Sequence, residues 1–124
     1  MNQKMKKIKL LISDVDGVWT DGTFYKGSGG MEFKRFTVLD GVGIAMARAA
    51  DLKIALISGR YSPATEHRAK ELKIEDVYNG SLNKFPAYEE LKAKYNFSLA
   101  ATLKTNNTMQ KNILHLTILK ALIK

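Results

Sequence analysis

The sequence lacks cysteine altogether and has no long apolar run. Without cysteine the protein forms neither disulfide bonds nor thiolate metal sites, and it fits a reducing compartment. The apolar run near the amino terminus, Leu10–Ile12, follows several lysines and is far shorter than the ~18 residues of a membrane-spanning helix. We therefore expect a cytoplasmic protein with neither a signal peptide nor a membrane span.

Acidic residues are missing from one part of the chain. All 12 of them lie at or before Glu90, whereas the segment from Asn96 to Lys124 contains lysines but no acid. The net charge of +8 describes either a solvated basic surface or a protein with an anionic partner, such as a phosphorylated small molecule. Nucleic acid is disfavoured as that partner, because the basic residues are spread out and are not interleaved with aromatic ones.

The 124 residues are enough for one domain, and short apolar segments alternate with helical ones along them. We expect buried strands over 8–13, 53–57 and 77–78, and helices over 42–50, 64–72 and 85–95. The aromatic segments 22–26 and 31–37 flank a glycine-rich centre and predict a β-hairpin. Strands that alternate with helices indicate an α/β fold with a doubly wound, three-layered parallel sheet.

Four polar residues follow the predicted strands at the points where those strands end. Asp14 and Asp16 come after the first strand, Ser58 after the second, and Lys84 after the third. Because ligands of open α/β sheets bind beyond the carboxyl ends of the strands, we expect these side chains to gather at one edge.

Two carboxylates placed together repel each other, and each costs free energy to desolvate, but a divalent cation removes that cost. Mg²⁺ suits the site because it binds one or two carboxylates and fills its other positions with water and phosphate. One aspartate can attack phosphorus, and the other can protonate the leaving oxygen. A hydroxyl at Ser58 and a cation at Lys84 suit the charge that develops on a transferred phosphoryl group.

Each of these residues also has an ordinary structural interpretation. The pair Asp14 and Asp16 alone could form a turn or a calcium loop, but Tyr25 stands where an EF-hand loop needs its bidentate glutamate. Ser58 alone could cap a helix, and Lys84 alone could be a solvated lysine. Their joint order along the chain favours the phosphate site.

Three motifs carry a resemblance to a known family: Asp14-Val-Asp-Gly-Val, Ser58-Gly-Arg and Asn83-Lys84. They resemble the first three signature motifs of the haloacid dehalogenase superfamily of phosphatases. From about residue 6 to residue 95, the chain is similar to the family that hydrolyses 3-deoxy-D-manno-octulosonate 8-phosphate. Phosphatases for nine-carbon, sialic-type sugar acids share these motifs, so the choice of phosphorylated sugar acid stays open.

The resemblance implies a role for each catalytic candidate. Asp14 would be the nucleophile that becomes an aspartyl-phosphate, and it would also bind Mg²⁺. Asp16 would be the general acid and base and would bind the metal through its backbone carbonyl. Ser58 would hold the phosphoryl group, and Lys84 would pair with both the phosphate and Asp14.

The resemblance also implies substrate contacts and an assembly. Arg60 would contact the charged end of the substrate, with Gly59 and Asp40 as further substrate-binding candidates. Such proteins have no cap domain and form homotetramers, in which the hairpin over 22–37 of one subunit helps to close the site of its neighbour. The alternative is a hairpin that packs on the core of its own chain.

The resemblance ends after Tyr95, where the family has a further strand and a Gly-Asp-Asp motif that supplies another magnesium ligand. Leu99–Leu103 could still form that strand, which would place Asn106 and Asn107 as neutral substitutes for the acidic pair. Losing a full charge there would weaken metal binding by roughly 1.5–3 kcal/mol. We therefore expect a core over 1–95 and a divergent basic tail over 96–124.

We expect that a frameshift or early stop produced this tail and left the fold incomplete at its carboxyl end. An apolar, basic helix over 109–124 is the alternative. Without the later strands, the first strand would lack a neighbour on one side. The protein would then be either an active phosphatase or an impaired member that acts through its oligomer interface.

Overall fold

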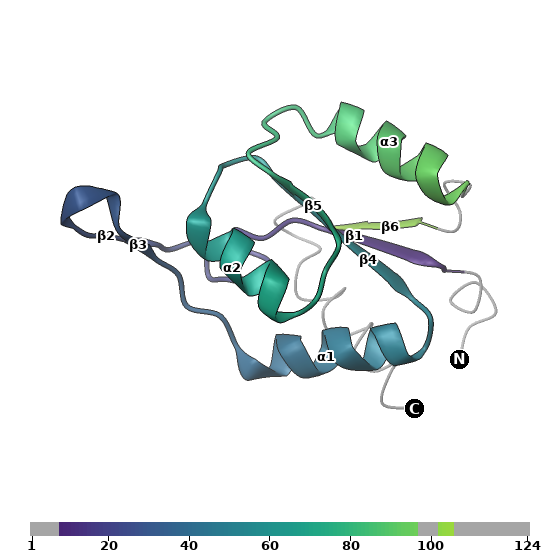
Figure 1. Ribbon diagram of the computed structural model, residues 1–124, viewed down its shortest axis with the longest axis horizontal. Coiled ribbons are helices and arrows are strands. Elements are labelled where there is room, and N and C mark those ends of the chain that lie inside the picture. The colour runs from purple at the N-terminus through teal and green to yellow at the C-terminus, as the bar shows by residue number, and fades with distance from the viewer. Residues whose placement is uncertain (1–7, 97–101, 106–124) are drawn as a thin grey trace.

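A computed structural model describes residues 8–96 together with the backbone of 102–105 (Figure 1). Its elements, in chain order, are β1 (Leu10–Ser13), β2 (Tyr25–Lys26), the 3₁₀ turn η2 (Ser28–Gly30), β3 (Glu32–Phe33), α1 (Val38–Ala49), β4 (Lys53–Ser58), α2 (Pro63–Glu71), β5 (Asp76–Asn79), α3 (Phe85–Tyr95) and β6 (Thr102–Thr105).

Among the described residues, the main sheet has four strands in the order β5-β4-β1-β6, and every neighbouring pair is parallel. From β1 the chain moves outward through β4 to β5, and then returns to the other side of β1 as β6. The strand order therefore reverses at β1. The predicted parallel sheet is confirmed, and the reversal at β1 makes the end of that strand a topological switch point.

Helices cover both faces of this sheet, so the fold has the three layers that the sequence predicts. Figure 1 shows α1 and α3 on opposite sides of the strands. Side chains alternate along each strand. Leu11 and Leu56 pack with residues of α1 and α2, whereas Ile12 and Ile57 pack with Tyr88 and the rest of the α3 face. The fold is a doubly wound α/β sandwich.

Capping residues determine where two of the helices begin. In α1 the Thr37 hydroxyl accepts a hydrogen bond from the backbone N–H of Asp40 at 3.2 Å, and in α2 Ser62 caps the turn that Pro63 opens. The predicted start of the first helix at residue 42 is therefore wrong by four residues. The polar cap starts α1, although Val38 is 80% exposed and contributes no core packing.

The predicted hairpin is present, but only two residues of each arm are paired. Tyr25 pairs with Phe33 and Lys26 with Glu32, across a turn in which Gly29 has a φ of 67°. The paired arms project beyond the end of the main sheet in Figure 1. Tyr25 and Phe33 are 63% and 59% exposed, so their rings are not part of the core of this chain.

The sixth strand corrects one expectation. β6 lies beside β1 with Leu11 opposite Leu103, so β1 is an interior strand, and β6 is at the edge of the part of the sheet that the structure describes. The strand predicted over 99–103 begins three residues later, at Thr102. Asn106, Asn107 and the helix considered over 109–124 lie outside the described residues. Within the described residues, no helix is long and apolar enough to cross a membrane.

The contact of α3 with the sheet gives a prediction about stability. Leu91 is fully buried against β1 and β4, and α3 follows directly after Lys84. Leu91→Ala should lower the free energy of unfolding by about 2–5 kcal/mol, because it removes buried methyl groups and leaves a cavity. Chemical denaturation measures this change. Lys92→Ala, at the exposed neighbouring position, should change it by less than ~0.5 kcal/mol, and an equal loss in both variants would contradict the packing.

Candidate active site

The first acidic residue of the motif stands where the strand order reverses. Ser13, the last residue of β1, is paired with Leu56 of β4 on one side and with Thr105 of β6 on the other. Asp14 follows immediately, at the carboxyl end of a strand that has neighbours on both sides. This is the position at which open α/β sheets bind their ligands.

The turn after β1 explains the spacing of the two aspartates. Val15 is completely buried, and its carbonyl accepts the backbone N–H of Trp19 at 2.9 Å. The Trp19 indole N–H donates to the Ser13 hydroxyl at 2.9 Å, which closes the turn onto the strand. With Val15 in the core, the flanking side chains of Asp14 and Asp16 stay 24% and 31% exposed.

Asp14 lies in contact with a lysine from a distant part of the chain. Its Oδ2 atom is 2.8 Å from the Nζ atom of Lys84, and its Oδ1 atom accepts the backbone N–H of Val15 at 2.7 Å. Lys84 directly precedes α3, so the position of that helix places the ammonium. The structure thus brings together two of the residues that the sequence selected.

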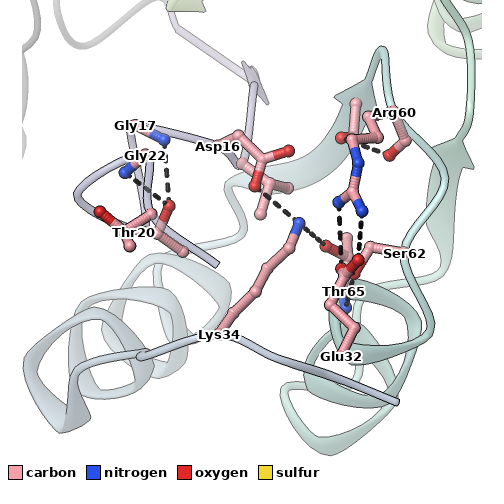
Figure 2. A network of polar contacts seen from close by, with 12 residues as sticks. Asp16, Gly17, Thr20, Gly22, Glu32, Lys34, Arg60, Ser62 and Thr65 are labelled. Atoms are coloured by element: carbon pink, nitrogen blue, oxygen red, sulfur yellow. Dashed lines mark hydrogen bonds and ion pairs between the residues drawn. The ribbon is translucent and has the colours of Figure 1, made fainter. Parts of the chain in front are cut away.

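Asp16 is paired with a second lysine, which the sequence analysis missed. The Lys34 Nζ atom lies 2.6 Å from Asp16 Oδ1 and donates to the Thr65 hydroxyl at 3.1 Å. Figure 2 shows the Lys34 side chain reaching between these two groups. The Lys34 side chain is 0% exposed, so its charge is compensated by protein groups rather than by water.

The loop after β4 is held by its own polar contacts and by the hairpin. Ser58 is buried, and its hydroxyl donates to the backbone carbonyl of Arg60 at 3.2 Å. Arg60 forms a two-pronged ion pair with Glu32 (Figure 2). Its guanidinium also lies 4.0 Å from the ring centroid of Phe24. Glu32 also accepts the Ser62 hydroxyl at 2.7 Å. The structure therefore links Arg60 to the hairpin of its own chain.

This environment changes the titration of both partners. The hydrogen bonds from Arg60 are the main cause that lowers the pKa of Glu32 to about 2 from its ordinary 4.5, with Ser62 and Lys26 adding to the effect against the cost of burial. The same pairing raises the pKa of Arg60 above its ordinary value. The ion pair stays fully charged at neutral pH.

Two further candidates, Gly59 and Asp40, come from different parts of the fold. Gly59 stands between Ser58 and Arg60, and a Cβ atom there would meet Leu82 and Ser81 at ordinary contact distances. Asp40 lies in the first turn of α1. Their predicted part in substrate binding stays a prediction.

Glu32 and Lys34 belong to the site although no motif pointed to them. The signal that could have found them is alternation along the return arm of the hairpin. Phe36 packs against the core, and Glu32 and Lys34 precede it at intervals of two residues. Residues at this spacing share one face of an extended chain, so both charged residues face the core side.

The donor atoms fit a magnesium ion that is held largely by water and substrate phosphate. Within the described residues, no group of three or more His, Cys, Asp or Glu side chains could hold a metal. The Asp14 carboxylate and the Asp16 backbone carbonyl, which the resemblance implies as ligands, would supply the protein's share, because Mg²⁺ in phosphate sites uses one or two carboxylates. The predicted neutral substitutes, Asn106 and Asn107, lie outside the described residues.

Comparisons with known proteins bear on this site. No protein-family model matches the chain. The 3-deoxy-D-manno-octulosonate 8-phosphate phosphatase of Escherichia coli K12 is 44% identical over 91 residues, which are 73% of this chain and 48% of that protein. The chain thus spans about half the length of the curated relatives that it matches.

Solved structures agree with the sequence comparison. A hydrolase of the haloacid dehalogenase superfamily from Legionella pneumophila matches with a TM-score of 0.80 and 35% identity, over 85% of this chain and 58% of that one. A second match is a 3-deoxy-D-manno-octulosonate 8-phosphate phosphatase from Moraxella catarrhalis, solved in complex with magnesium, phosphate and KDO. Its TM-score is 0.79 and its sequence identity 36%, over 85% of this chain and 60% of that one. In sequence and in fold, the chain is similar to members of the haloacid dehalogenase superfamily. The resemblance drawn from its motifs is therefore confirmed at the level of family and fold.

The ion pair between Glu32 and Arg60 gives a prediction about stability and pH. The pKa of Glu32 is lower in the folded chain than in the unfolded one. Its contribution to the free energy of unfolding is therefore present above about pH 4.5 and is lost as the pH falls towards about 2. Glu32→Gln should lower the free energy of unfolding at neutral pH by about 2 kcal/mol. The difference in free energy of unfolding between Glu32→Gln and the unmodified protein should disappear in acid.

Chemical denaturation at several pH values measures this gap. Glu89→Gln removes a carboxylate whose side chain is 45% exposed, and it serves as the matched control with little effect at any pH. A gap between Glu32→Gln and the unmodified protein that stays constant from neutral pH to about pH 2 would contradict the depressed pKa.

Proposed function

We propose that this chain is a magnesium-dependent phosphomonoesterase that hydrolyses 3-deoxy-D-manno-octulosonate 8-phosphate. The observation that carries this proposal is the contact of Asp14 with Lys84 at the switch point of the sheet. A carboxylate nucleophile beside a fixed cation suits the transfer of an anionic phosphoryl group. The substrate is proposed from the curated relative and from the solved complex with magnesium, phosphate and KDO.

In this proposal the side chains divide the chemistry of two steps between them. Asp14 attacks phosphorus and forms the aspartyl-phosphate, while Asp16 gives a proton to the leaving sugar oxygen. Asp16 then takes a proton from a water molecule, which attacks the aspartyl-phosphate and releases phosphate and free Asp14. Lys84 balances charge on the phosphoryl oxygens, and Ser58 at the end of β4 holds that group.

Asp14 and the backbone carbonyl of Asp16 would hold Mg²⁺, which supplies a positive charge against the phosphoryl oxygens when bound. Arg60, Gly59 and Asp40 would then contact the sugar acid. The Arg60 side chain is 37% exposed while it pairs with Glu32, so part of it is accessible to an anion. A cytoplasmic location and the division into a 1–95 core and a 96–124 tail are part of the same proposal.

A phosphate-release assay with the purified chain tests the activity. With Mg²⁺ and the eight-carbon ester, the unmodified protein should release phosphate, and Asp14→Asn should abolish this because an amide cannot attack phosphorus. Asp16→Asn should lower the rate by about 10²–10⁴-fold, which is the contribution of general acid–base catalysis. Asp21→Asn is the matched control, since Asp21 lies in the same loop and is 53% exposed.

Activity retained in Asp14→Asn would contradict the nucleophile. No magnesium-dependent release by the unmodified protein, on the sugar phosphate or on an aryl phosphate, would contradict the proposal as a whole. That result would favour the alternative of an impaired member that acts through its oligomer interface.

We also propose a homotetramer in which the hairpin of one subunit contacts its neighbour. Tyr25 and Phe33 form an exposed aromatic pair across the two arms, and Phe24 and Met31 add apolar surface beside them. Exposed rings on a projecting arm suit burial against a second copy of the chain.

Light scattering after gel filtration tests this assembly. The unmodified protein should elute as a tetramer, and the double variant Tyr25→Lys/Phe33→Lys should shift towards monomer with unchanged circular dichroism. Leu82→Lys alters an 88% exposed residue outside the hairpin and should stay tetrameric. A tetramer that survives the double variant would exclude the hairpin as the main contact.

A further inference from the structure

The burial of Lys34 is costly and therefore calls for a compensating role. A lone ammonium taken out of water costs several kcal/mol, and that cost is offset only by good pairing. The next residue, Arg35, is 80% exposed and pairs with Asp21 at 3.3 Å. The same arm thus carries one cation in solvent and one with a side chain that is 0% exposed.

The Lys34 ammonium is held from two sides. Thr65, which accepts its second hydrogen bond, is 1% exposed and lies in the first turn of α2. Ser62 caps that turn by accepting the backbone N–H of Thr65 at 3.4 Å. The position of the ammonium is therefore set by a capped helix, and Asp16 contacts a fixed group.

The contact also distinguishes the two oxygens of the Asp16 carboxylate. Lys34 donates to Oδ1 at 2.6 Å, so that oxygen is committed to the ion pair. A proton that Asp16 gives or takes would then sit on Oδ2. Figure 2 shows the Lys34 ammonium at Asp16, a contact that restrains the direction of the carboxylate.

We propose that Lys34 is a positioning residue that orients Asp16 for proton transfer to the leaving oxygen. The proposal rests on the proposed phosphatase function. Lys34 does not contact the substrate, because its side chain is 0% exposed, and it acts only through Asp16.

The test compares two esters that differ in their need for a proton. Departure of the sugar oxygen from 3-deoxy-D-manno-octulosonate 8-phosphate needs general-acid help, whereas p-nitrophenolate leaves p-nitrophenyl phosphate without it. The value of kcat/KM reports the steps up to release of the leaving group. The ratio of kcat/KM for the two esters does not depend on the fraction of folded enzyme, so partial misfolding does not mimic the effect.

Lys34→Met should lower kcat/KM for the sugar phosphate by about 100-fold, within the range of general-acid catalysis. It should change kcat/KM for the aryl phosphate by less than about threefold. Lys34→Gln keeps a neutral donor for Asp16 and should give an intermediate ratio; it also replaces the methionine variant if that protein is insoluble. Arg35→Met, on the exposed side of the same arm, should leave both values unchanged.

Equal losses on the two esters in the Lys34 variants, or no loss on either ester, would overturn the role of Lys34 and leave the phosphatase function standing. In either case, the ratio of kcat/KM for the two esters would equal that of the unmodified protein. If the unmodified protein hydrolyses neither ester, the proposed function fails, and this proposal fails with it.

Discussion

Compensation of the two acidic charges after β1 is the constraint on which the rest of the site depends. Asp14 and Asp16 are separated only by the buried Val15, so both carboxylates belong to the same turn that anchors the loop in the core. Each carboxylate has its own lysine, Lys84 before α3 and Lys34 on the hairpin arm. The two cations come from opposite sides of the fold, so the site forms only when the helix layer and the hairpin are both in place.

The hairpin therefore has two distinct faces. Its outer aromatics are exposed, whereas the charged residues on the inner face of its return arm, Glu32 and Lys34, are buried against the loops after β4 and β1. Glu32 holds Arg60, and Lys34 holds Asp16, so a single extended segment connects two loops of the site (Figure 2). This arrangement lets the hairpin project while its base stays fixed.

Much of the fold could be predicted from the sequence, because strand length, helix periodicity and caps are local signals. Residues 53–57 lie within β4, and α3 begins and ends at the predicted residues 85 and 95. The candidates Asp14 and Lys84 could be predicted to meet because parallel strands share one edge. Lys34 could not, since its burial depends on how the hairpin folds back onto α2. The start of α1 was missed because a threonine cap outweighs the exposed residues that follow it.

The central claim is that Asp14 attacks phosphorus. Trapping the covalent intermediate tests it most directly: the enzyme is mixed with Mg²⁺ and the sugar phosphate, quenched in acid, reduced with borohydride and digested. Mass spectrometry should find homoserine in place of Asp14, and only when substrate is present. Reduction at another aspartate, or at none during confirmed turnover, would contradict the account.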